Sequence, residues 1–66
     1  MSAVLFHVYI LDRGERMYLM DWIVEDGIDH PCFTTIRDRA MHFSRFDGAN
    51  AYRKRLLRMH YQAHVV

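Results

Sequence analysis

The sequence contains a single cysteine, Cys32, among its 66 residues. One cysteine cannot form a disulfide within the chain, whereas small secreted domains usually depend on several disulfides, so we expect a protein of a reducing compartment. The chain also has no apolar run long enough to span a bilayer. Its apolar start has neither the basic segment nor the small-residue cleavage site of a signal peptide. We therefore predict a cytoplasmic protein that does not act at a membrane.

Glycine is also scarce. Gly14, Gly27 and Gly48 are isolated, so no glycine-rich loop is present to surround a phosphate, and nucleotide binding is not expected. The chain has no repeats, linkers or low-complexity segments, and its length allows one domain, residues 1–66. A chain this short buries only about 60% of its unfolded surface on folding. A partner or a second copy would therefore help to stabilise it.

Charge is nearly balanced over the whole chain but is distributed unevenly. The formal net charge is +1. Residues 1–33 contain two arginines and six carboxylates, a net charge of −4, whereas residues 34–66 contain seven basic residues and two aspartates, a net charge of +5. This separation indicates two surfaces of opposite sign.

Residues 3–25 predict an antiparallel β-hairpin. The segments 4–11 and 17–25 are rich in β-branched and aromatic residues, and the polar turn between them contains Gly14, which can adopt a positive φ. Asp26-Gly27 marks a second turn. Strict alternation divides the hairpin into two faces, both largely apolar. One face would carry Val4, Phe6, Val8, Ile10, Tyr18, Met20, Trp22 and Val24; the other would carry Leu5, His7, Tyr9, Leu11, Met17, Leu19, Asp21, Ile23 and Glu25.

Residues 32–43 allow two interpretations. The segment 32–36 suits a strand by its β-propensity. However, Ile36, Ala40 and Phe43 have the i, i+4, i+7 spacing of a helix face. We favour a third strand, with a short helix as the alternative.

Residues 45–62 predict an amphipathic helix. Apolar residues recur along it at spacings of three and four, at Ala49, Tyr52, Leu56, Met59 and Ala63. Ser44 and Asp47 are both candidates for the N-terminal cap. The expected fold is therefore of the α+β class, with a small antiparallel sheet of about three strands and one long C-terminal amphipathic helix packed across it.

Basic residues lie off this apolar stripe. They are Arg53, Lys54, Arg55 and Arg58, with Arg45 upstream. Such a face could bind a nucleic acid through its phosphates, and this is our alternative hypothesis for the function. No helix-turn-helix spacing, aromatic ribonucleoprotein motif or zinc-finger pattern supports it. A solvated basic face that balances the acidic hairpin explains the same residues.

One helix can cover only one face of the predicted sheet. If it covers the face with Val8, the apolar residues of the opposite face must be covered by residues 32–43 or by another chain. An apolar face of that size, if left exposed, marks an interface. We therefore predict that a protein partner or a second copy binds through Leu5, Tyr9, Leu11, Leu19 and Ile23.

No group of residues predicts an enzyme, a cofactor or a metal site. Cys32 follows His30 by two positions, but no cysteine-hydrolase signature surrounds it, and a semi-buried apolar side chain is the simpler interpretation. His60 and His64 have the i, i+4 spacing that can bind a metal on a helix, yet no third ligand is evident in the sequence. Histidines in a last helical turn are also favoured by the helix dipole.

Two strands joined by a polar turn are followed by Ala40-x-x-Phe43 and then by Asp47-x-Ala49-x-Ala51 at the start of a helix. This plan, over most of residues 4–62, resembles short accessory proteins of phages and prophages, including host-defence inhibitors of the anti-CRISPR type. The resemblance implies a small non-enzymatic protein that binds another protein and inhibits it. Anti-CRISPR proteins that mimic DNA are acidic, and the basic helix departs from that pattern. No functional residue carries over from the resemblance.

Overall fold

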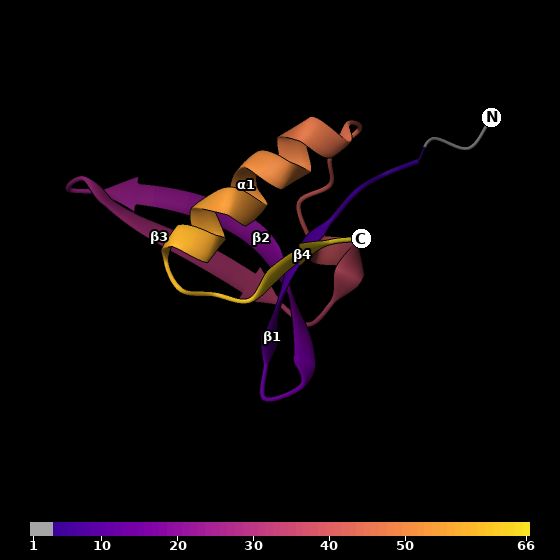
Figure 1. The fold of residues 1–66 in the computed structure, drawn as a ribbon, viewed down its shortest axis with the longest axis horizontal. Helices are drawn as coiled ribbons and strands as arrows, with labels where there is room; N and C mark the ends of the chain where they lie inside the picture. The colour runs from indigo at the N-terminus through magenta and orange to yellow at the C-terminus, as the bar shows by residue number, and fades with distance from the viewer. Residues whose placement is uncertain (1–3) are drawn as a thin grey trace.

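A computed structural model describes residues 4–66 as one antiparallel sheet with one helix packed on it (Figure 1). The neighbouring strands follow the order β3-β2-β1-β4. The predicted α+β class is confirmed. The sheet has four strands rather than about three, and the helix is followed by a strand instead of ending the chain. The predicted start of the first hairpin, residue 3, lies outside the described residues. The elements are β1 (Val8–Asp12), β2 (Glu15–Glu25), β3 (Ile28–Thr34), a 3-10 turn η1 (Arg37–Arg39), α1 (Phe46–Arg58) and β4 (Ala63–Val65).

Two tight turns of the same type build the two hairpins. Both residues of each two-residue loop have positive φ, at 54° and 82° for Arg13 and Gly14, and at 53° and 74° for Asp26 and Gly27. This is the type I′ geometry, whose twist matches that of the flanking strands. The second hairpin, β2 with β3, extends to one side of the helix and is called the arm below (Figure 1).

A β-bulge divides β2 into two parts. Leu19 pairs with Phe33 and Asp21 pairs with Cys32, so Met20 is an extra residue in β2. The bulge reverses the alternation, and strict alternation therefore assigns the wrong faces on one side of it. Leu19 has no exposed surface and belongs to the core, whereas Met20 is 39% exposed. The predicted assignments of Leu19 to the uncovered face and of Met20 to the helix face are both wrong.

The core lies between the sheet and α1. On β1, Val8 and Ile10 are buried as predicted, and Phe6 packs against them. On the helix, the predicted apolar stripe places Leu56 in the centre of the core. The buried cluster consists of Val8, Ile10, Leu19, Ala49, Leu56 and Ala63.

Residues 32–43 contain part of each predicted alternative. Residues 32–34 belong to β3, which begins earlier than predicted, and residues 37–39 form the short 3-10 helix η1. The strand β3 ends at Thr34, and the chain then returns to the gap where β2 separates from β1. There the Met41 N–H donates to the Leu19 carbonyl at 2.9 Å, and Phe43 forms an isolated bridge with Phe6. The segment thus provides hydrogen-bond partners for backbone groups that the bulge separates from a neighbouring strand.

The helix ends at Arg58 rather than at residue 62. His60 adopts a left-handed conformation with φ of 69°, and the Tyr61 N–H donates to the Leu56 carbonyl while the His60 N–H donates to that of Leu57, each at 3.0 Å. These bonds form a Schellman motif. The chain changes direction at His60, and β4 can then pair with β1. Residues 63–65 therefore form a strand instead of a last helical turn. At the other end, the N-cap is Arg45, without a side-chain cap, so the predicted caps at Ser44 and Asp47 are absent.

Replacing His60 with glycine is expected to raise the free energy of unfolding by about 0.5–1 kcal/mol. Glycine adopts positive φ without the steric penalty that a Cβ atom imposes. His60→Ala is the matched control, because it removes the imidazole and keeps the Cβ atom. Urea denaturation of the three proteins measures the difference, and equal stabilisation by alanine would show that the imidazole, and not the backbone, is responsible.

Candidate protein interface

The sheet face opposite α1, called the outer face below, is open to solvent along much of its length. The register places Tyr9 opposite Tyr18, and Leu11 opposite Arg16, on this face. Beyond the bulge, the same face continues along the arm with the pair Ile23 and His30 and the pair Glu25 and Ile28. Large apolar side chains are exposed on it, at Leu11, Met20, Ile23 and Ile28.

Tyr9 lies at the centre of an aromatic cluster on the outer face. The imidazole of His64, from β4, stacks on its ring with centroids 5.2 Å apart, and the Arg16 guanidinium lies 4.4 Å from the ring centroid. Tyr18 approaches edge-on at 6.1 Å. Three strands therefore hold an amphipathic cluster that is ordered within the free chain.

His7 anchors one border of this cluster. It is buried, its Nδ1 atom lies 3.2 Å from the Met41 carbonyl oxygen, and its ring meets Tyr18 edge-on. His7 thus connects the outer face to the segment that fills the gap between β1 and β2. These contacts give it a structural role in positioning Tyr18.

The predicted partner-binding residues do not all lie on one surface. Leu5, Leu11 and Ile23 are exposed and Tyr9 is half-buried, but Leu19 is in the core. The sequence prediction missed Tyr18, Met20 and Ile28. Ile28 follows a recognisable Asp-Gly turn and was within reach of pattern analysis. Tyr18 and Met20 lie on the outer face through the register of the first hairpin, which pairs Tyr9 with Tyr18.

The predicted basic residues also separate. Arg45 precedes the helix, with its guanidinium 4.0 Å from the Asp47 carboxylate. Arg55 packs over Tyr52 and Trp22, at 5.1 and 5.9 Å from the ring centroids. The other three predicted basic residues, Arg53, Lys54 and Arg58, lie on one side of α1.

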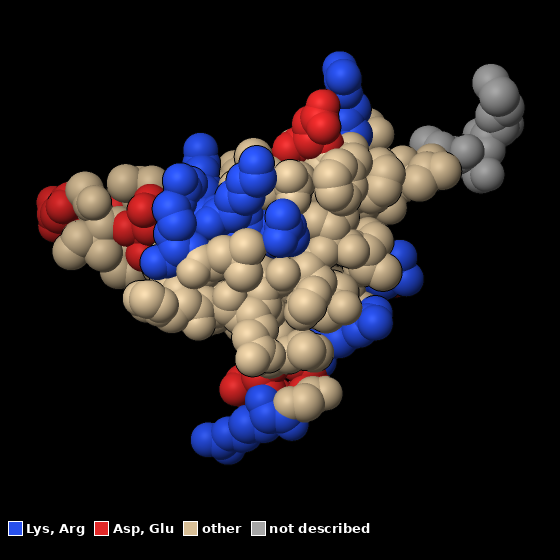
Figure 2. All heavy atoms as spheres, in the orientation of Figure 1, with Lys and Arg blue, Asp and Glu red and all other residues tan. Residues whose placement is uncertain are grey.

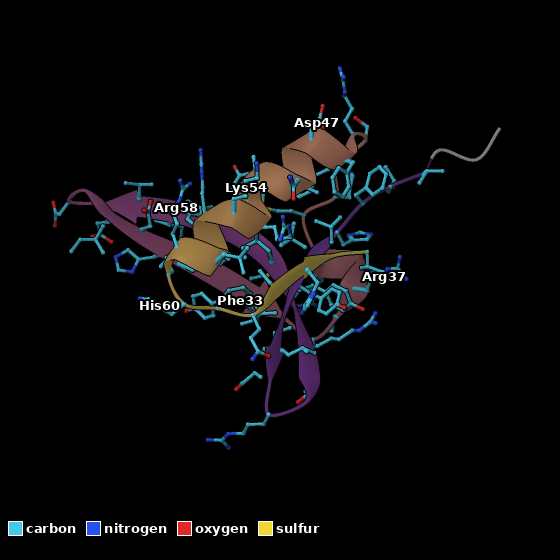
Figure 3. The ribbon with its side chains drawn as sticks, viewed as in Figure 1. Phe33, Arg37, Asp47, Lys54, Arg58 and His60 are labelled. Carbon is cyan, nitrogen blue, oxygen red and sulfur yellow. The ribbon has the colours of Figure 1, made fainter. Side chains whose placement is uncertain are left out.

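These three cations surround an exposed leucine. Leu57 is 43% exposed, and three basic residues lie close to it on the helix: Arg53 and Lys54 one turn before it, and Arg58 directly after it. We call these four residues the cationic helix face. Figure 2 shows basic side chains gathered over α1, and Figure 3 labels Lys54 and Arg58 on it. Within residues 4–66, no ion pair joins this face to the arm.

Tyr52 and Tyr61 offer no open stacking platform beside the cations. The Tyr52 ring lies 5.5 Å from Trp22 and 5.4 Å from Phe43, and Tyr61 contacts Phe33 at 5.4 Å. Both tyrosines are therefore part of the packing between α1, the arm and the segment before the helix. Stacking on nucleic-acid bases would require these contacts to open.

The cysteine and the two C-terminal histidines lie apart from one another in the described part of the chain. The Cys32 thiol lies 3.8 Å from the backbone carbonyl oxygen of His30, and within residues 4–66 it forms no hydrogen bond with an imidazole. His60 follows the helix end and His64 lies on β4, so they do not share a helix face. Residues 4–66 contain no cluster of three histidine, cysteine or acidic side chains suited to a metal ion. No helix in this range meets the length and hydropathy needed to cross a membrane.

No protein-family model, curated protein or solved structure matches this chain significantly.

Proposed function

We propose that this chain is a non-enzymatic protein-binding module that docks on another protein through its outer face. The observation that carries the proposal is the exposure of this face: α1 covers one side of the sheet, and the other presents the Tyr9 cluster together with exposed apolar side chains. A bare apolar sheet face is unusual for an isolated small domain and is typical of a contact surface.

The composition of the outer face suits a protein partner. Tyrosine and arginine are the residue types most often responsible for binding energy at protein interfaces. Tyr9, Tyr18 and Arg16 are already held against one another, so binding would immobilise few additional rotamers. Exposed apolar side chains along the arm would extend the contact, and the charged Asp21 and Glu25 would lie at its border.

Inhibition of the partner, in the manner of the phage-type proteins that the chain resembles, is the form of this function that we propose. A domain that acts without catalysis changes its partner by occupying a surface of it. The same proposal places the protein in the cytoplasm, where its single thiol stays reduced.

Replacing Ile23 with asparagine is expected to abolish partner binding, whereas Val24→Asn should leave it intact. The two residues are adjacent on β2 but lie on opposite faces, with 45% and 62% of their surface exposed. The immobilised wild type and both variants would be exposed to a lysate of the organism that encodes the chain, and the retained proteins identified by mass spectrometry. A partner lost equally from both variants would overturn the assignment to the outer face.

Nucleic-acid binding through the basic residues is the second candidate. The three clustered cations of α1 favour it, because none of them has a carboxylate partner within residues 4–66. The arm argues against it, since Asp29 lines the same groove as Arg55 and Arg58 and would repel a phosphate backbone. Titration of labelled single-stranded and duplex oligonucleotides at low salt tests this candidate, which requires a steep loss of affinity as salt is raised.

A further inference from the structure

The end of the arm is an acidic and apolar surface. Residues 17–36 contain four carboxylates and no lysine or arginine. Two of these carboxylates, Glu25 and Asp26, lie at the β2–β3 turn, where Val24 and Ile28 are among the most exposed apolar side chains of the molecule. We call residues 24–28 the acidic tip. Figure 2 shows acidic side chains at this extremity of the molecule, where Figure 1 places the β2–β3 turn.

The cationic helix face has the complementary composition. Leu57 is exposed among Arg53, Lys54 and Arg58, so an occupant of this face should carry both carboxylates and apolar groups. Burial of Leu57 against an apolar group would exclude water around the ion pairs and strengthen them. The acidic tip presents this combination.

Val24 of the tip lines a groove with Arg58 of the same chain, but within residues 4–66 the two tip carboxylates form no ion pair with the cationic helix face. The tip lies beyond the end of α1 in Figure 1, and the described residues have no ion pair between α1 and either strand of the arm. Asp29 lines the same groove as Arg58, but its carboxylate accepts a hydrogen bond from the Trp22 indole N–H at 3.1 Å. Each surface is therefore available to a second copy.

We infer that the acidic tip of one copy binds the cationic helix face of a second copy. Residues 24–28 pack on Leu57, with Glu25 and Asp26 near Lys54 and Arg58. When both copies exchange tips, the contact is reciprocal and closes a two-fold dimer. The contact uses only the end of the outer face, at Glu25 and Ile28, and leaves Tyr9, Tyr18 and Ile23 available for the partner proposed above.

A second copy fits the charge distribution better than a polyanion does. A phosphate backbone lying along α1 would approach the carboxylates of the arm, as the groove between Asp29 and Arg58 shows. A second copy places negative charge only where its tip lies. Its own cationic helix face then meets the acidic tip of the first copy, so the carboxylates that would repel a phosphate backbone form attractive contacts instead.

Charge reversal tests this contact. The tip variant carries Glu25→Arg and Asp26→Arg, and the helix variant carries Lys54→Glu and Arg58→Glu. Arginine at position 26 suits the turn, because Arg13 occupies the equivalent position of the other hairpin with nearly the same φ. All four side chains are exposed, so circular dichroism should show both variants folded.

Sedimentation equilibrium at low salt gives the readout. The wild type, with a chain mass of 8.0 kDa, should sediment with about twice that mass, and its association should weaken at least roughly tenfold when salt is raised to 0.5 M. Each variant alone should be monomeric, because tip and helix then carry charges of the same sign. An equimolar mixture should regain the dimer mass, because the reversed tip meets the reversed helix and the native tip meets the native helix.

Three results would overturn the inference. They are a monomeric wild type at low salt, a dimer that survives in either variant alone, and a mixture that stays monomeric. Ile23→Asn separates this contact from the outer face: it should leave the salt-sensitive dimer unchanged, so failure of one proposal does not decide the other. Binding of an oligonucleotide by the wild type without self-association would favour the nucleic-acid candidate and also reject this one.

Discussion

Leu56→Ala should lower the free energy of unfolding by about 3 kcal/mol, whereas Leu57→Ala should change it by less than about 0.5 kcal/mol. Leu56 has no exposed surface and packs between α1 and the sheet, while Leu57, the next residue, is 43% exposed. Truncation of Leu56 leaves a cavity in a core of few residues. Truncation of Leu57 removes a side chain that solvent already surrounds.

The loss at Leu56 is large relative to the stability of such a small domain. Domains are stabilised by about 0.05–0.15 kcal/mol per residue, which corresponds to roughly 3–10 kcal/mol for this length. Leu56→Ala is therefore expected to populate unfolded molecules even without denaturant. Urea titration followed by circular dichroism provides the comparison. Similar losses for the two leucines would contradict the orientation of α1 on the sheet.

Deletion of Met20 should lower the free energy of unfolding by only about 1–2 kcal/mol, well below the effect of removing a buried tryptophan. Met20 is the extra residue of the bulge between Leu19 and Asp21. Without it, Leu19 is followed directly by Asp21, so regular alternation keeps Leu19 and Trp22 on the helix side and Asp21 on the outer face, as in the wild type. The contact of Trp22 with Tyr52, at 5.5 Å, is then retained.

Met20→Thr is the control for the deletion. It keeps the number of residues, and therefore the bulge, and replaces a partly exposed side chain by one with high β-propensity, so a change below about 1 kcal/mol is expected. Trp22 is the only tryptophan of the chain, so its fluorescence reports its environment directly. Emission from the deletion variant should stay at the wild-type wavelength. A shift to longer wavelength, with a loss of stability as large as that of Leu56→Ala, would show that Trp22 depends on the bulge for its position.

The two hairpin turns, and the residues that β1 and α1 contribute to the core, could be predicted from local patterns. Gly14 and Gly27 identify the turns because their conformations are available to few other residues. Alternation places Val8 and Ile10 together on one face of β1, and the spacing of Ala49 and Leu56 predicts the buried side of α1. In each case, neighbouring residues in the sequence provide the physical signal.

The candidate interface was predicted only in part, because its residues depend on the bulge. Ile23 and Leu11 are exposed as expected, but Leu19 lies on the opposite side of the sheet. A bulge leaves no clear local signal in a strand where residues of both alternations are apolar, as in residues 17–25. Pairing with β3 and packing against α1 select the position of the extra residue, and neither is a property of β2 alone.

The basic helix shows the same division between sequence and tertiary structure. The sequence by itself determined the class of the fold, the separation of charge along the chain and the apolar stripe of α1, because these follow from composition and short-range periodicity. Only the tertiary structure decided that Arg55 packs on Trp22, that the helix ends before His60, and that residues 63–65 complete the sheet. These outcomes depend on the pairing of β4 with β1 and on contacts between residues far apart in the chain, whose free energies no local pattern contains.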